Sequence, residues 1–182
     1  MTRDELCKSI YETSHLKGTF KLRSGQISNE YFDKYLFESN PVILREIAKQ
    51  LAKQVPEGTE ILAGLEMGGI PIASALSIET GIPTVFVRKK AKEYGTCKLA
   101  EGTDFSNKQV CIIEDVVTTG GQILLSAEDL RSCGAKLASV MCVIERNPEG
   151  RKKLEEAGLE LKSLFTMEEL KKYELNERKC EY

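Results

Sequence analysis

The stretch from Val110 to Gln122, VCIIEDVVTTGGQ, constrains the fold of this chain more than any other part of it. A short apolar run leads into Glu114 and Asp115, and two threonines and two glycines follow before an amphipathic segment. This order predicts a strand over 110–113, a polar loop that begins at Glu114, and a helix over 122–133. Glycines let the backbone turn tightly round a ligand, and the N-terminus of a helix offers unpaired N–H groups to an anion.

The acidic pair narrows the kind of anion that such a loop would hold. Carboxylates repel phosphate, but they accept hydrogen bonds well from vicinal hydroxyls. A ribose phosphate carries both groups and therefore satisfies both halves of the motif. The stretch does not fit GxxxxGK[ST] or GxGxxG, the patterns of P-loops and dinucleotide folds. The other interpretation is a strand followed by a capped helix that binds no ligand.

Composition sets outer limits on the function. The 182 residues are enough for one compact domain. Lys and Arg total 26 and Asp and Glu total 28, so a net charge of -2 gives no global attraction to nucleic acid or to anionic lipid. No run of eighteen apolar residues occurs, so we expect neither a signal peptide nor a membrane span, and we expect a cytoplasmic protein. His15 is the single histidine, which argues against a multi-histidine metal site.

Apolar periodicity predicts an α/β fold with a central, mostly parallel sheet flanked by helices. Successive strand, helix and strand patterns imply right-handed parallel crossovers. An N-terminal hairpin runs through Phe20 and Leu22, turns at Ser24-Gly25, and returns through Tyr31, Phe32 and Tyr35. The expected strands are 61–63, 84–88, 110–113, 137–144 and 159–166, and the expected helices are 3–13, 41–55, 71–80, 122–133, 149–157 and 167–179.

Residues 88–109 have few apolar anchors and carry several lysines and glycines. A polar segment of this length inside a compact domain is typically a functional lid or a disordered connector. It lies between two expected strands whose carboxyl ends should border a ligand site. We therefore expect a mobile catalytic loop.

IIEDVVTTGG resembles the phosphoribosyl pyrophosphate (PRPP) signature of type I phosphoribosyltransferases, and other segments are similar to the orotate phosphoribosyltransferases. Those enzymes join orotate to PRPP, giving orotidine 5'-monophosphate and pyrophosphate in de novo pyrimidine (UMP) biosynthesis. The resemblance implies a single type I domain over 1–182, with residues 1–40 largely forming a hood over the carboxyl edge of the sheet. It also implies a homodimer in which the mobile loop of one subunit reaches the site of its partner, with no nucleic-acid or membrane partner.

The segment GTFKLRSGQISNEYFDK resembles the substrate segment of that family, and Glu145-Arg146 resembles its orotate-binding position. A planar guanidinium can bind the orotate carboxylate through two hydrogen bonds while an aromatic ring covers the base. The orotate-binding residues implied by the resemblance are Arg23, Tyr31, Phe32, Thr118 and Arg146.

The resemblance also implies the residues for PRPP and catalysis. VRKKAK resembles the start of the catalytic loop, whose cations would stabilise the leaving pyrophosphate. Lys92, Glu114 and Asp115 are the implied catalytic residues, and Tyr94 stands where many family members have histidine. Magnesium would bind through PRPP oxygens and water, with no direct protein ligand. The implied PRPP-binding residues are Met67, Gly68, Arg88, Lys89, Lys92, Tyr94, Glu114, Asp115, Val116, Val117, Thr118, Thr119, Gly120, Gly121 and Gln122.

Three other interpretations remain open from the sequence. One is a type I phosphoribosyltransferase that acts on a purine or on uracil. Another is a PRPP-sensing regulator with the same fold, which predicts a basic nucleic-acid face or an added DNA-binding domain. The third is an α/β protein in which the motif occurs by accident.

Overall fold

The computed structural model describes residues 1–22, 24–89 and 99–177, with side chains up to residue 173. In this part of the chain a six-stranded sheet has the order β5-β4-β3-β6-β7-β8. β3, β4, β6, β7 and β8 are parallel, and β5 pairs antiparallel with β4 at the edge. The strands are β3 (Ile61–Leu65), β4 (Thr84–Val87), β5 (Ala100–Gly102), β6 (Gln109–Val117), β7 (Lys136–Glu145) and β8 (Glu160–Thr166).

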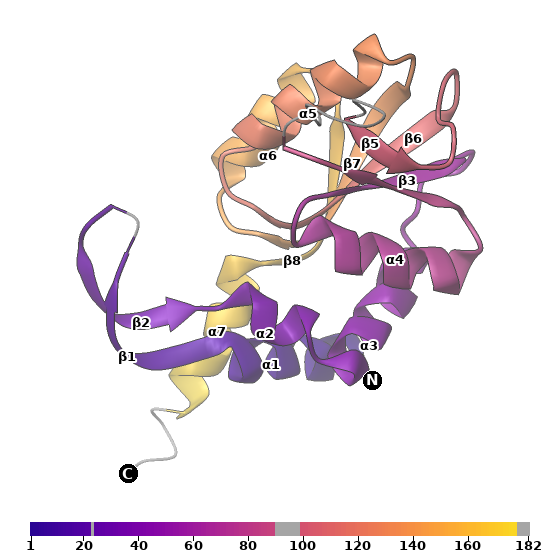
Figure 1. The fold of residues 1–182 in the computed structure, drawn as a ribbon. Coiled ribbons are helices and arrows are strands. Elements are labelled where there is room, and N and C mark those ends of the chain that lie inside the picture. The colour runs from indigo at the N-terminus through magenta and orange to yellow at the C-terminus, as the bar shows by residue number, and fades with distance from the viewer. Residues whose placement is uncertain (23, 90–98, 178–182) are drawn as a thin grey trace.

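Helices cover both faces of this sheet, as Figure 1 shows. On one face lie α3 (Pro41–Ala52) and α4 (Gly69–Thr80), together with α1 (Arg3–Ser14), α2 (Lys34–Glu38) and α7 (Met167–Glu177). On the other face lie α5 (Gly121–Ser132) and α6 (Pro148–Glu156). The predicted α/β architecture, with a mostly parallel sheet between helical layers, is confirmed. Among the described helices, none combines the length and the apolar composition needed to cross a membrane.

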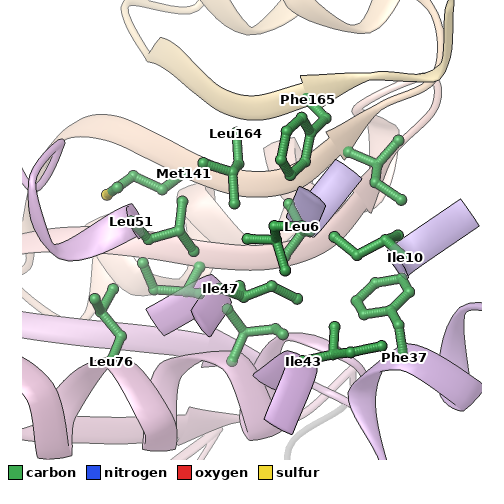
Figure 2. Close-up of a cluster of buried hydrophobic side chains, with 14 of the residues drawn as sticks. Leu6, Ile10, Phe37, Ile43, Ile47, Leu51, Leu76, Met141, Leu164 and Phe165 are labelled. Atoms are coloured by element: carbon green, nitrogen blue, oxygen red, sulfur yellow. The ribbon is translucent and has the colours of Figure 1, made fainter. Parts of the chain in front are cut away.

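The N-terminal segment contributes both to the core and to a separate hairpin. Thr2 and Glu5 form a capping box that starts α1, and the apolar side chains of this helix turn inward. Figure 2 shows Leu6 and Ile10 in one buried cluster with Phe165 of β8. Arg3 adds a hydrogen bond from Nη2 to the Leu164 carbonyl oxygen, 2.8 Å away. The first helix is therefore held directly against the last strand of the sheet.

The predicted hairpin is present as β1 (His15–Lys21) and β2 (Ile27–Phe32), but its second strand is shorter than predicted. Tyr35 lies in α2 rather than in a strand, so that part of the prediction is wrong. The reason is local, because the Asp33 side chain accepts a hydrogen bond from the Tyr35 N–H and starts a helix. The hairpin extends away from the helical layers in Figure 1.

Two further boundaries differ from the prediction. β6 continues to Val117, so Glu114 and Asp115 belong to the strand and not to the loop after it. Pairing with β7 continues to the end of the strand, where Val117 is opposite Glu145. Ala100–Gly102, within the segment expected to be a mobile loop, forms β5 and pairs with β4. Residues 90–98 of that segment lie outside the described residues.

Candidate active site

The carboxyl ends of β3, β6 and β7 meet at one edge of the sheet. β3 and β7 flank β6 in parallel register, so the loops that follow these three strands are neighbours. The backbone N–H of Arg146, just after β7, donates to the carbonyl oxygen of Val117 at the end of β6, at 2.8 Å. This edge is where open α/β sheets bind their ligands.

A cavity of about 400 Å³ opens at this edge, between the sheet and the N-terminal segment. It brings together four of the five predicted orotate residues, namely Tyr31, Phe32, Thr118 and Arg146. The fifth, Arg23, lies outside the described residues. Lys34 and Tyr35 of α2 also line this cavity, and sequence reasoning gave neither of them a role.

A second cavity, of about 700 Å³, shares Tyr31, Phe32 and Arg146 with the first. Its other walls include His15 and Lys171, and its lining includes no residue of the threonine-glycine loop. A base in the first cavity would lie next to that loop, whereas a base in the second would not. The smaller cavity is therefore the one that can hold a base joined to a ribose phosphate.

The threonine-glycine loop has the geometry of a phosphate cradle. Thr118 and Thr119 are exposed, and Gly120 has φ of 72°, a conformation that favours glycine. Gly120 is the N-cap of α5 and gives the first turn no side-chain hydrogen bond. Those N–H groups can therefore be satisfied by an anion. Gly150 of α6 packs close to the loop, because a β-carbon there would lie 2.6 Å from the Thr118 carbonyl oxygen.

The loop after β3 approaches the same edge through Gly68, which is buried. A β-carbon at Gly68 would lie 1.6 Å from Oδ2 of Asp115. At Gly69 it would lie 2.3 Å from the Ile113 carbonyl oxygen. Both glycines therefore let the start of α4 rest directly on β6, while Met67 beside them is 60% exposed.

The start of the predicted catalytic loop is hydrogen-bonded to Glu66, in the loop after β3. Glu66 donates its backbone N–H to Val87 and accepts the N–H of Lys89 on Oε1, at 2.9 and 2.8 Å. Arg88 precedes Lys89, and its Nε lies 3.6 Å from Glu101 of β5. These contacts place two of the predicted pyrophosphate ligands beside Met67. The other two, Lys92 and Tyr94, lie outside the described residues.

The two motif carboxylates have different surroundings. Asp115 is fully buried and forms an ion pair with Lys34 Nζ, whereas Glu114 is only partly buried. Burial opposes ionisation of Asp115, but hydrogen bonds from Glu114, Glu38 and Lys34 outweigh it and lower the pKa of Asp115. Burial, and then the charge of Asp115, raise the pKa of Glu114 well above its usual range. A ribose contact at Asp115 stays a prediction, and such a contact would be shared with Lys34.

The sequence of this chain matches a known protein family. The model of the phosphoribosyl transferase domain matches residues 37–170. An orotate phosphoribosyltransferase of Nocardioides sp. is 49% identical over 171 residues, covering 93% of this chain and 96% of the relative. That of Methanocella arvoryzae is 43% identical over 170 residues, with 93% and 97% covered. The chain belongs to the orotate phosphoribosyltransferase family.

The fold agrees with that of a solved orotate phosphoribosyltransferase. The crystal structure of the Mycobacterium tuberculosis enzyme superposes with a TM-score of 0.85 at 26% identity, covering 92% of this chain and 98% of that one. The type I phosphoribosyltransferase fold predicted from IIEDVVTTGG is thereby confirmed. The site predicted from the sequence omitted Lys34 and Glu38, which reach Asp115 from α2. The only local signal was the Asp33 cap that starts this helix directly after the aromatic pair.

Proposed function

We propose that this chain transfers the 5-phosphoribosyl group of PRPP to orotate, giving orotidine 5'-monophosphate and pyrophosphate in pyrimidine biosynthesis. One observation carries the proposal. A single cavity joins the Arg146 guanidinium and the aromatic pair of β2 to Thr118, at the start of the threonine-glycine loop. A site for a flat anion therefore adjoins a site for a phosphate.

Orotate fits the first part of this cavity because it is planar and carries a carboxylate. Arg146 can bind that carboxylate through two parallel hydrogen bonds, and the rings of Tyr31 and Phe32 supply an apolar wall for the base. Thr118 and Arg23 complete the proposed orotate contacts. Uracil and the purines have no carboxylate for the guanidinium, so this arrangement favours orotate over the bases of other type I enzymes.

The ribose 5-phosphate part of PRPP would lie along the end of β6. Backbone N–H groups from Val117 to Gly121, with Thr118, Thr119 and Gln122, would hold the 5'-phosphate, whereas the Val116 N–H is already donated to Asp115 Oδ1. Glu114 and Asp115 would accept hydrogen bonds from the ribose hydroxyls and favour positive charge at C1. As orotate nitrogen bonds to C1, the bond from C1 to the pyrophosphate oxygen breaks and pyrophosphate leaves with the electron pair.

Negative charge then develops on the leaving group, and cations placed beside it stabilise the transition state. Arg88 and Lys89 begin the loop that carries these cations. Hydrogen bonds to Glu66, which precedes Met67 and Gly68, hold the start of this loop. We assign Lys92 to the leaving oxygen and Tyr94 to a hydrogen bond with pyrophosphate. This part of the proposal rests on the sequence resemblance.

Magnesium fits this site as a partner of PRPP rather than of a protein cage. In the described part of the chain no group of three or more His, Cys, Asp or Glu side chains is arranged to hold a metal. Asp115 is already paired with Lys34, so PRPP oxygens and water would supply the ligands of the metal. Mg²⁺ keeps much of its hydration and binds substrate phosphates readily. When bound, it would neutralise part of the pyrophosphate charge.

We also propose a cytoplasmic homodimer in which residues 88–109 of one subunit reach the site of the partner, as the family resemblance implies. Neither nucleic acid nor a membrane is a proposed partner, in keeping with a net charge of -2.

The deciding experiment follows the ultraviolet absorbance of orotate after mixing protein, Mg²⁺ and PRPP. We expect the absorbance to fall and orotidine 5'-monophosphate to form, with little product from uracil, adenine or hypoxanthine under the same conditions. Omission of PRPP is the control. Turnover of another base in preference to orotate would overturn the orotate assignment, and PRPP binding without turnover of any base would favour the regulator.

A further inference from the structure

Glu38 lies against the second motif carboxylate from the end of α2. It is buried, with 5% of its surface exposed, and Asp115 is fully buried. A β-carbon at Gly68 would lie 2.9 Å from Glu38 Oε1 and 1.6 Å from Asp115 Oδ2, so both oxygens lie over the same small patch of backbone. The carboxyl groups of Glu38 and Asp115 are thus both buried and lie close together at the edge of the sheet.

The donors around this pair are distributed unequally. Asp115 accepts the backbone N–H of Val116 on Oδ1 and forms an ion pair with Lys34 through Oδ2. Among the described residues, no donor supplies a hydrogen bond to Glu38 Oε1. Two buried carboxylates in contact cannot both be ionised at low cost. The geometry therefore places the negative charge on Asp115 and the proton on Glu38, which can then donate to Asp115.

The electrostatics of the cluster agree with this assignment. Burial, then the hydrogen bond and charge of Asp115, raise the pKa of Glu38 to about 9. Burial alone would lower the pKa of Lys34, but the hydrogen bond and charge of Asp115 raise it. The charged and titratable groups that face Glu38 are Asp115 and Glu114 from β6 and Lys34 from its own helix, while the start of α4 presents the uncharged backbone of Gly68.

We propose that Lys34 and Glu38 are positioning residues that keep the Asp115 carboxylate ionised and correctly oriented for the ribose of PRPP. This inference rests on the proposed function for the ribose contact. Glu38 supplies a proton to one side of Asp115, and Lys34 supplies a positive charge from the cavity side, where it lines the wall. An ionised carboxylate accepts hydrogen bonds about twice as strongly as a neutral one. Loss of the Glu38 proton would add a second negative charge and compete for Lys34.

The test measures kcat/KM for PRPP at saturating orotate between pH 6 and pH 10. We expect Lys34→Met to lower it about 10-fold or more at neutral pH, the equivalent of one lost charge-assisted contact. Lys34→Arg should recover part of this loss. Glu38→Gln, which keeps a donor toward Asp115, should lose less activity than Glu38→Ala, and its activity should decline at a higher pH than that of the wild type.

Matched controls are Lys8→Met and Glu12→Gln, which remove an exposed ion pair on α1. Both should retain the wild-type pH profile. The positioning role would be overturned if Lys34→Met kept the wild-type kcat/KM for PRPP across this pH range. It would also be overturned if kcat/KM of Glu38→Gln declined at the same alkaline pH as that of the wild type.

A second measurement does not depend on turnover. With glutamate labelled by carbon-13 at the side-chain carboxyl, the resonance that disappears in Glu38→Gln belongs to Glu38. We expect this resonance to report a protonated carboxyl at pH 7 and to titrate only on the alkaline side. Titration of this resonance in the acid range would overturn the proton assignment. If the wild type fails to convert orotate, the proposed function fails, yet this titration still decides where the proton lies.

Discussion

Arg151 of α6 binds both carboxylate oxygens of Glu145, the last residue of β7. Nε donates to Oε1 at 2.9 Å, Nη2 donates to Oε2, and Nη1 reaches the Leu161 carbonyl oxygen. Ser163 donates a further hydrogen bond to Glu145 at 3.0 Å. The Glu145 carboxylate, one residue before Arg146, is therefore fixed from α6 and β8.

Replacing Arg151 with methionine should destabilise the protein, because it leaves the Glu145 carboxylate buried without its main partner. We expect a loss of about 2 kcal/mol in the free energy of unfolding, less than for a fully buried pair since the Arg151 side chain is 35% exposed. Urea unfolding at pH 7 measures it. Lys152→Met, on an exposed pair one residue along, is the control and should change stability little.

The same pair makes a pH-dependent contribution to stability. The hydrogen bond from Arg151 is the largest cause that lowers the pKa of Glu145 below its ordinary value of 4.5. A group with a lowered folded-state pKa stabilises the fold above its unfolded pKa and loses that contribution as the pH falls through the folded value. The stability difference between wild type and Arg151→Met should therefore be full at pH 7 and shrink below about pH 4.5. A difference that stays constant down to pH 3 would contradict this.

Arg146 should determine the affinity for orotate. Arg146→Lys keeps the charge but loses the paired geometry of the guanidinium, and we expect KM for orotate to rise about 10-fold or more, with a smaller change in KM for PRPP. Steady-state kinetics with each substrate varied in turn measures both. Arg45→Lys, at an exposed position on α3, is the matched control. Equal KM values for orotate in the two variants would argue against the orotate contact.

Gly68→Ala should be far more damaging than its size suggests. The added methyl group would meet Asp115 Oδ2 and displace either α4 or the carboxylate from β6. We expect a loss of stability well above the roughly 1 kcal/mol of an ordinary glycine replacement at a strained position, together with weaker PRPP binding. Gly58→Ala is the control, since nothing lies within 4 Å of that site and only its φ of 79° opposes the change. Thermal unfolding and calorimetry with PRPP compare the two variants.

Glu66→Ala should weaken PRPP binding without affecting the sheet. Its carboxylate accepts the Lys89 N–H and so holds the start of the basic loop beside Met67. Without this contact, we expect KM for PRPP to rise about three- to ten-fold, in line with the net contribution of one typical hydrogen bond. Glu79→Ala, exposed on α4, should leave KM unchanged. A KM for PRPP that stays at the wild-type value in Glu66→Ala would contradict the anchoring role.

Strands could be predicted from the sequence where the pattern of apolar residues is local. Alternating and continuous apolar runs identified β3, β4, β6, β7 and β8, because each run is bounded by its own turn residues. β5 was missed because Ala100–Gly102 is short and weak in strand propensity, and its pairing with β4 decides its conformation. The end of β6 was placed too early for a related reason. Glu114 and Asp115 are charged, so the sequence pattern predicts a loop there, whereas Asp115 is in fact buried in the strand and paired with Lys34.

The motif residues and Arg146 could be proposed from the sequence because their spacing and chemistry are recognisable within short segments, and the structure places Thr118 and Arg146 at one cavity. Lys34 and Glu38 were not, since nothing in their own segment indicates that α2 lies against the end of β6. Only the packing of the N-terminal segment onto the sheet brings them to Asp115. Long-range contacts of this kind are set by tertiary structure rather than by local pattern.

The contact of α1 with β8 has a consequence for how the enzyme is made in the cell. Leu6, Ile10 and Arg3 pack on α2 and α3, but they also contact Leu164, Phe165 and α7 near the other end of the described chain. During synthesis the first helix leaves the ribosome long before β8 and α7 exist, so this part of its packing must wait until translation is nearly finished. The hairpin and α2 follow α1 in the chain. They are synthesised early and reach their final positions late. The final seating of α1 against the sheet is therefore completed only after the last strand has been synthesised.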